Sequence, residues 1–308
     1  MEYKHIPVLL KETIQGLNIK PNGIYVDGTL GRGGHSSEVL KHLTTGHLYC
    51  FDQDKQAIEE SKERLEKISS SFTLINDNFR NMKDDLYNLG IEKVDGIMFD
   101  LGVSSAQFDE SDRGFSYRFD ARLDMRMNKE ANLSAYDVVN SYSLNDLTRI
   151  LREYGEEKFA YQIAKAIVRK RELKKIETTF ELVEVIKSVL PSKVLSKVGH
   201  PAKQTFQAIR IEVNDELNVL KKALETSITL LKSQGRMCVI TFNSLEDRIV
   251  KEFFNKLAKE ESVSRKLPTI ENKLEYRLIN RKVIVASEEE LENNNRAKPA
   301  KLRIIERN

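Results

Sequence analysis

The fold is decided by the stretch Ile24-Tyr25-Val26-Asp27-Gly28-Thr29-Leu30-Gly31-Arg32-Gly33-Gly34-His35. Its first residues are apolar and predict a short strand, and a helix is expected to open at about Ser36. Glycines in the turn between them let the backbone take positive φ and let a ligand approach closely. Because the first N–H groups of a helix point at whatever fills such a turn, a nucleotide-like ligand is its natural occupant.

The next predicted strand supports a nucleotide site. Residues 47–51 are apolar and lead to Asp52, which lies 19 positions after Gly33. An acidic side chain about 20 residues past a glycine turn, at the tip of the second strand, is where a ribose diol is bound. We therefore expect Asp52 to bind ribose and Asp54 to cap the helix that begins near Lys55. A plain strand-to-helix connection is the alternative.

The spacing of the glycines separates classes of nucleotide. They stand at Gly28, Gly31, Gly33 and Gly34, which does not fit the G-x-G-x-x-G pattern of dinucleotide-binding folds. No Walker lysine follows them, which disfavours a phosphate-cradling NTPase. The register resembles the acidic strand end and glycine-rich first motif of S-adenosylmethionine-dependent methyltransferases. A nicotinamide-dependent oxidoreductase is the alternative of a different class.

Strands and helices alternate along the first hundred residues. Strands are expected at 24–27, 47–51, 72–75 and 94–100, with helices at 6–19, 36–43, 55–68 and 81–89. This alternation predicts a parallel sheet with right-handed crossovers. Ligands of such sheets bind beyond the carboxyl ends of the strands. That rule gathers four residues at one edge: Asp27, Asp52, Phe79 and Asp100.

The alternation stops after Asp100. Helical, mixed-charge patterns follow at 144–153, 156–173, 179–190 and 203–233. The sheet is expected to resume with a strand at 235–242, a helix at 245–258 and a late strand at 282–286, before a charged tail. We predict an α/β methyltransferase domain formed by 1–108 and 213–308, interrupted by an inserted, mostly helical substrate-recognition domain at 109–212.

Composition describes a globular chain. Of its 308 residues, 40% are hydrophobic and 31% are charged, and the net charge of +3 says little about partners. Cys50 and Cys238 lie in apolar runs, which predicts buried thiols and a reducing, cytoplasmic location. We expect no membrane span and no secretory signal. No Cys/His cluster suggests a metal site.

Longer motifs carry a family resemblance. They are the opening stretch, 100–105 (DLGVSS), 113–116 (RGFS), 123–127 (LDMRM), 154–157 (YGEE), 200–202 (HPA), 206–208 (FQA) and 244–248 (SLEDR). In these motifs, which occur in the same order, the chain resembles the bacterial RsmH (MraW) family from residue 4 to about 304. The resemblance implies a Rossmann-like, class I S-adenosylmethionine-dependent methyltransferase. It implies methylation of N4 of a cytidine in 16S ribosomal RNA.

The resemblance also carries residue roles onto this sequence. Cofactor contacts are implied at Gly33, Gly34, His35, Asp52, Phe79, Asp100 and Gln107. The glycines and the His35 backbone would lie against the methionine part, and Phe79 would pack near the adenine, with an internal packing role as its alternative. Asp100 and Gln107 would line the floor where the sulfonium and the target base meet.

Asp100 is the expected catalytic residue. The cytosine N4 lone pair is delocalised and nucleophilically weak, so an acceptor for its protons helps the transfer, and alignment of the reacting atoms supplies the rest. The family usually has His where this chain has Asn243. Because Asn cannot take a proton at neutral pH, we infer that this position orients a neighbour and is not the base.

Basic residues predict where RNA is held. Arg113 and Arg126 follow the active edge in sequence, and further cations follow in the insertion and the tail, including His200, Lys203 and Arg210. Such residues bind phosphates, although a solvated surface explains them equally well. The expected partner is small-subunit ribosomal RNA or the assembled subunit. The oligomeric state stays open, with a homodimer as one alternative.

Two further functions stay open. An S-adenosylmethionine-dependent amino-methyltransferase acting on another nucleic acid is the nearest alternative, although the Asp/Asn-Pro-Pro-aromatic motif of DNA enzymes is absent at 100–103. A ribosome-assembly factor that binds RNA and cofactor without catalysis is the other.

Overall fold

The computed structural model describes residues 7–104, 107–108, 110–196, 199–259 and 274–308. These fall into two compact units, each with its own core. We call residues 1–102 and 218–308 the sheet unit, and residues 103–217 the helical unit. The sequence analysis expected the chain to change domains after residues 108 and 212.

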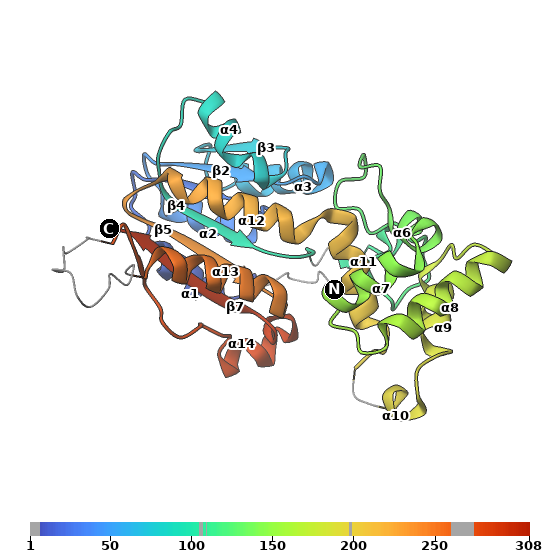
Figure 1. Ribbon diagram of the computed structural model, residues 1–308. Helices are drawn as coiled ribbons and strands as arrows, with labels where there is room; N and C mark the ends of the chain where they lie inside the picture. The colour runs from blue at the N-terminus through green and yellow to red at the C-terminus, as the bar shows by residue number, and fades with distance from the viewer. Residues whose placement is uncertain (1–6, 105–106, 109, 197–198, 260–273) are drawn as a thin grey trace, which may run out of the picture. The chain divides into compact units, whose positions relative to one another are not determined.

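The sheet unit is built on one seven-stranded sheet (Figure 1). Five strands are parallel: β1 (Ile24–Asp27), β2 (His47–Phe51), β3 (Phe72–Ile75), β4 (Val94–Asp100) and β5 (Leu231–Thr241). β7 (Lys301–Arg307) lies antiparallel between β5 and the edge strand β6 (Tyr276–Leu278). The order β3-β2-β1-β4-β5-β7-β6 reverses direction between β1 and β4, which is the switch point where ligands of such sheets bind.

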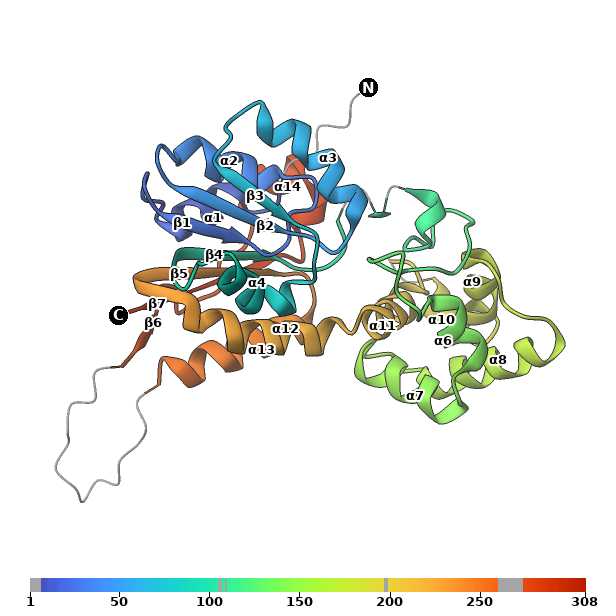
Figure 2. The ribbon, with the colours of Figure 1, turned by 90° about the horizontal axis from the view of Figure 1, so that it is seen from above.

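Helices cover both faces of this sheet (Figure 2). One face carries α1 (Leu10–Leu17), α2 (Gly34–His42) and α3 (Lys55–Glu66). The other carries α4 (Met82–Asn88), α12 (Glu216–Ser227) and α13 (Ser244–Leu257). Two apolar clusters result, one per face, and strand residues supply both in alternation. Burial on both faces explains why these strands are near-continuous apolar runs in sequence.

The α/β, Rossmann-like prediction with a helical insertion is confirmed by this topology. Cys50 and Cys238 are buried free thiols in β2 and β5. The late strand expected at 282–286 is wrong, because Ile284 forms only an isolated bridge to Leu302. The charged tail instead contains β7, which was missed, and the short helix α14 (Glu288–Asn293).

Helix starts also differ from expectation. Helix α1 begins at Leu10 and not in the region of Pro7, because Leu9 has a left-handed backbone with φ of 51°. In the helical unit, α8 (Ala160–Leu173) begins four residues later than expected, after Glu156 with φ of 51°. Non-glycine residues rarely adopt positive φ, so neither the later start of α1 nor that of α8 could be predicted from the sequence.

The helical unit has a separate apolar core. It is formed by α6 (Ala135–Ser141), α7 (Leu144–Glu153), α8, α9 (Thr179–Lys187) and α11 (Lys203–Asn214), with the short α10 (Ser192–Leu195). Capping boxes at Ser134 with Asp137 and at Thr178 with Glu181 fix the starts of α6 and α9. None of the helices in the described ranges is long and apolar enough to cross a membrane.

Candidate active site

The glycine-rich turn is held between its neighbouring strands. The Gly28 N–H donates to the Met98 carbonyl of β4, and the Leu30 N–H donates to the Phe51 carbonyl of β2, both at 2.9 Å. Gly33 takes φ of 70° at the start of α2, a conformation that side chains disfavour. A Cβ on Gly34 would lie 2.5 Å from Pro7 Cγ. The local backbone therefore requires glycine at these two positions, whatever ligand is bound.

Asp27 braces the turn from the end of β1. Its carboxylate accepts a hydrogen bond from Ser36 Oγ at 2.6 Å and another from the Thr29 N–H at 3.0 Å. Thr29 Oγ1 in turn accepts from the Asp100 N–H at 2.6 Å. Burial raises the pKa of Asp27, against the lowering effect of these hydrogen bonds. Sequence reasoning gave Thr29 and Ser36 no role, although hydroxyl residues flanking a glycine turn after an acidic strand end were a usable signal.

Asp52 holds the same turn from the end of β2. One of its carboxylate oxygens accepts from the Gly31 N–H at 2.8 Å and the other from the Asp54 N–H at 2.9 Å. Burial raises the pKa of Asp52 to about 7. Each oxygen keeps a second lone pair, so this bracing leaves capacity for a ribose hydroxyl. Asp54 caps α3 by accepting from the Gln56 N–H, which confirms the prediction for that residue.

Asp100 ends β4 with one oxygen unpartnered. Its Oδ1 is buried and has no hydrogen-bond partner in the described structure. Its Oδ2 lies 3.6 Å from Nδ1 of the buried His35. The His35 Nε2 is 3.0 Å from the Val8 carbonyl oxygen and donates to it, because that oxygen only accepts. Burial, with the charges of Asp27 and Glu246, raises the pKa of Asp100 to about 8.

Phe79 lies just beyond the end of β3, at the start of a single 3-10 turn. Its ring packs against Phe99 of β4 with centroids 5.3 Å apart, and its side chain stays half-buried. Packing against the core and contact with a base are therefore physically compatible at this residue.

The donor set at this edge suits a cationic nucleoside. Within the described residues, no Lys or Arg lies within ion-pair distance of Asp27, Asp52 or Asp100. Three acidic side chains without a cation therefore surround a glycine turn at the switch point of the sheet. Burial raises the pKa of Asp52 and of Asp100, and a cationic ligand would favour the ionised form of both groups, whose lone pairs accept hydroxyl groups. S-adenosylmethionine, which carries a sulfonium cation and a ribose diol, fits these residues.

Among the described residues, no group of three or more His, Cys, Asp and Glu is placed to hold a metal ion.

Gln107 belongs to the helical unit. It is 7% exposed, and its Oε1 accepts from the Ser104 N–H at 3.2 Å while its own N–H donates to Ser104 Oγ at the same distance. A residue whose sequence context alone suggests a surface loop is therefore buried. Ser105 of the same motif lies outside the described residues.

Three arginines expected to contact RNA are engaged inside the helical unit. Arg113 is 3% exposed and donates to the carbonyl oxygens of Arg126 and Met127. Arg126 makes two bonds to the Asp124 carboxylate, at 2.9 and 2.7 Å, and a third to a carbonyl. Arg210 makes two bonds to Glu216, at 2.8 and 2.9 Å. This geometry leaves these guanidinium groups little capacity for phosphate.

His200 and Lys203 are more accessible. The His200 ring stacks on Tyr117 with centroids 4.1 Å apart and planes 9° from parallel. Burial, with the positive charges of Lys187 and Arg118, lowers the pKa of His200. Lys203 is exposed at the start of α11. These two residues are free to take the RNA role expected of them.

Asn243 caps α13. Its side-chain oxygen accepts from the N–H groups of Leu245 and Glu246, both at 3.0 Å, and Glu246 bonds back to the Asn243 N–H. This capping box supports the inference that the position orients its neighbours. It also places Glu246 beside the acidic edge, where its charge contributes to the raised pKa of Asp100. Sequence reasoning had not assigned Glu246 a role.

Comparison with known proteins places the chain in a family. The model of the MraW methylase family matches residues 2–308. The chain belongs to this family. Two similar relatives are named ribosomal RNA small subunit methyltransferase H. The one from Exiguobacterium sibiricum is 56% identical over 99% of this chain and 98% of its own length. The one from Oenococcus oeni is 52% identical over 100% and 99%.

Solved structures are similar at lower identity. An rRNA methylase from Streptococcus thermophilus is 12% identical, with 98% of each chain covered and a TM-score of 0.40. A protein from Streptococcus mutans in complex with SAH is 17% identical, with 99% of this chain and 100% of that chain covered and a TM-score of 0.43. Our fold assignment rests on the strand order described above and not on these scores.

Proposed function

We propose that this member of the MraW methylase family transfers a methyl group from S-adenosylmethionine to N4 of a cytidine in 16S ribosomal RNA of the small subunit. The observation that supports S-adenosylmethionine as the cofactor is the set of three acidic side chains, without a paired Lys or Arg, around the glycine turn. The names of the relatives at 52–56% identity support the substrate. They also disfavour an amino-methyltransferase acting on another nucleic acid.

The cofactor residues follow from the edge of the sheet unit. Gly33, Gly34 and the His35 backbone would hold the methionine part, where α2 begins without a side-chain cap. Asp52 would accept from the ribose hydroxyls with the lone pairs that its bonds to the turn leave over. Phe79 would contact the adenine, and Gln107 stays a predicted cofactor contact. The bound cofactor supplies a methyl group on a cationic sulfur.

We assign to Asp100 the role of proton acceptor for the methylated amine. Transfer of the methyl group to N4 would leave the amine positively charged, so the amine must lose a proton. The carboxylate of Asp100 can accept it, because Oδ1 is unpartnered. A pKa of about 8 lies close to neutral pH, where a group exchanges protons efficiently. The second Asp100 oxygen, Oδ2, lies 3.6 Å from Nδ1 of His35, which is too far for a hydrogen bond.

RNA contacts outside the active edge are assigned to the helical unit. His200 and Lys203 are its accessible candidates for RNA contact. We propose that the protein acts in the cytoplasm, on naked RNA or on the assembled subunit, and either as a monomer or as a homodimer.

The activity is tested by transfer of labelled methyl groups to small ribosomal subunits from cells that lack the gene. Nucleoside analysis of the product should find N4-methylated cytidine. Methylation at another atom or base would overturn the assignment of the target. Failure to bind S-adenosylmethionine would overturn the whole proposal, because the glycine-rich turn would then not be a site for this cofactor.

The role of Asp100 is tested by Asp100→Asn and Asp100→Ala, with the exposed Asp84→Asn on α4 as the control. Loss of a general base costs about 10²–10⁴-fold in rate. We expect a fall in kcat of that order for both Asp100 variants and none for the control. Near-normal turnover by Asp100→Ala would show that the proton goes elsewhere.

A further inference from the structure

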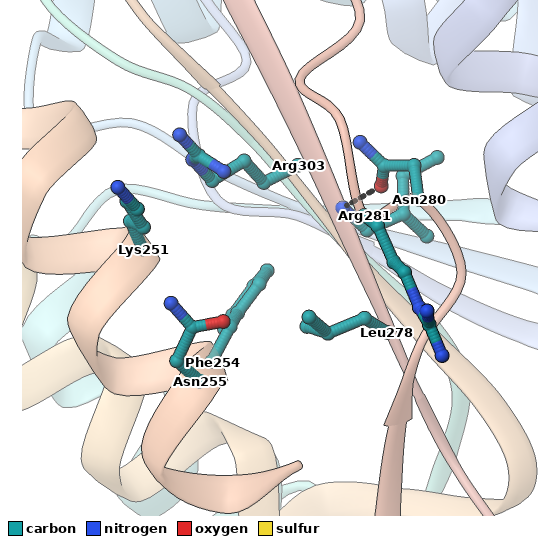
Figure 3. A pocket seen from close by; sticks show the side chains of 8 residues that line it. Lys251, Phe254, Asn255, Leu278, Asn280, Arg281 and Arg303 are labelled. Atoms are coloured by element: carbon teal, nitrogen blue, oxygen red, sulfur yellow. Dashed lines mark hydrogen bonds between the residues drawn. The ribbon is translucent and has the colours of Figure 1, made fainter. Parts of the chain in front are cut away.

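A basic hollow lies on the sheet unit away from the glycine turn. It is formed between α13 and the β6–β7 edge of the sheet, and it encloses about 300 Å³, including the part open to solvent. Figure 3 shows Lys251 on α13 and Arg303 on β7 at one side, with Arg281 on the opposite wall. Its apolar lining is supplied by the side chains of Phe254 and Leu278, and the backbone of Ile304 completes it.

The apolar lining makes the hollow a favourable place for an ionic contact. Phe254 is buried, at 1% exposed, and Leu278 is half-buried. Apolar walls keep the local dielectric low, so a cation there attracts an anion more strongly than it would on an open surface. No carboxylate is among the lining residues, and of the three cations that line the hollow only Arg303 is ion-paired, with Asp247.

Arg303 is oriented before any ligand arrives. Its Nε donates to Asp247 Oδ1 at 2.7 Å, and Lys301 holds the other oxygen of Asp247 at 3.1 Å. The Arg303 side chain is 14% exposed, and its remaining N–H groups have no partner within the described residues. An anchored guanidinium with free N–H groups loses little entropy on binding a phosphate.

Lys251 and Arg281 complete the rim. Both are exposed, and neither has an ion pair or side-chain hydrogen bond within the described part of the chain. The loop that carries Arg281 is fixed by Asn280, which accepts from the Ile304 N–H at 2.8 Å and donates to the Leu302 carbonyl (Figure 3). Lys251 and Arg281 are thus two cations without an ion-pair partner among the described residues, on opposite walls of the hollow.

The register of the sheet relates this hollow to the active edge. Arg303 pairs with Val239 of β5, and Asp100 pairs with the next residue, Ile240. The two residues therefore lie two strands apart, roughly 10 Å at about 4.8 Å per strand, and their side chains project from opposite faces of the sheet. An RNA strand that presents a base at Asp100 would reach the hollow with neighbouring phosphates by passing around the ends of β5 and β7.

We propose that the basic hollow binds a backbone phosphate of the RNA substrate, outside the nucleotide that is methylated. This inference rests on the proposed function, because RNA is the phosphodiester partner that the function supplies. The hollow contributes affinity and no sequence preference, since phosphate contacts position a nucleic acid without reading its bases.

The test compares Lys251→Ala/Arg281→Ala with Lys221→Ala/Lys222→Ala, which removes the same charge from exposed positions on α12. The probe is a labelled fragment of 16S ribosomal RNA, titrated over a range of salt concentrations. Each lost phosphate contact makes the slope of log affinity against log salt shallower by about 1. Because one phosphate contact is lost, we expect a change of about 1 for the hollow variant, a raised KM and an unchanged kcat, with no change for the control.

Two outcomes would overturn the proposal. One is a salt slope for the hollow variant equal to that of the wild type, and the other is an equal change in both variants, which would reflect net charge alone. A second arm replaces chloride with inorganic phosphate at constant ionic strength. Weaker competition with RNA in the hollow variant than in the wild type is expected, and equal competition in both would count against the site.

This test separates the hollow from the proposed function. Cofactor binding and methylation by the wild type decide the function, whereas only the difference between the two variants decides the hollow. Thermal unfolding of both variants checks that the exposed substitutions leave the fold unchanged.

Discussion

Replacing Arg113 separates a structural arginine from one that contacts RNA. Its Nη2 donates to the carbonyl oxygens of Arg126 and Met127 at 2.9 and 3.0 Å, and its side chain is 3% exposed. Hydrogen bonds to a charged group contribute about 1.5–3 kcal/mol each, and Arg113→Ala also leaves two carbonyls without this partner. We therefore expect a loss of roughly 3–5 kcal/mol in the free energy of unfolding of the helical unit.

The assay is thermal and urea unfolding followed by circular dichroism. A loss of this size lowers Tm by roughly 10–20 °C in a unit of about a hundred residues. The control is Arg118→Ala, because Arg118 is exposed in the same segment and its side chain has no partner among the described residues. Surface substitutions of that kind change stability by about 0.5 kcal/mol or less.

RNA binding provides the result that would refute this reasoning. Below its unfolding temperature, Arg113→Ala should bind 16S ribosomal RNA with the wild-type salt dependence. If the variant keeps wild-type stability and its salt slope becomes shallower by about 1, Arg113 contacts phosphate and the internal bonds described above are not its main role.

Two further predictions concern the acidic edge and its capped helix. Burial raises the pKa of Asp52 to about 7 and that of Asp100 to about 8, from about 3.9 in an unfolded chain, so the ligand-free folded state binds more protons between about pH 4 and 8. The free energy of unfolding should therefore fall as pH rises through that window, by up to about 1.4 kcal/mol per pH unit for each group, and Asp100→Asn should flatten the fall in urea titrations. A rise in stability over the window would contradict these assignments. Asn243→Ala removes the cap of α13 and should cost about 1 kcal/mol of stability. Asn243→Ser should restore most of that loss, and an Asn243→Ala variant that is as stable as the wild type would argue against the cap.

The parallel half of the sheet could be predicted from sequence because its strands are short apolar runs bounded by turn residues. The predicted bounds of β2 and β3 match the structure to the residue. β7 escaped notice because charged and apolar residues alternate in it, as in Lys301-Leu302-Arg303-Ile304. Its charged side chains have partners that only the fold supplies, such as Asp247 for both Lys301 and Arg303. The alternation itself was a usable signal for a strand with one polar face.

The candidate site was predictable to the extent that topology decides it. Acidic residues at the ends of parallel strands must lie at one edge, so the gathering of Asp27, Asp52 and Asp100 follows from the strand assignments. The bond from the Gly31 N–H to Asp52 depends on the path of the turn, which sequence spacing does not determine. The same limit applies to Arg126. Sequence alone does not show whether an arginine side chain faces solvent or bonds to a carboxylate.

The position of β7 has a consequence for the order in which the protein is made. β7 lies between β5 and β6, so residues 301–307 join two strands that are synthesised before them. The ribosome must therefore deliver these residues before the sheet unit can be completed. The helical unit is one continuous segment with its own core and can fold during synthesis, as N-terminal domains generally do. While translation continues, the open side of β5 is an unpaired strand edge that chaperones or other chains can bind.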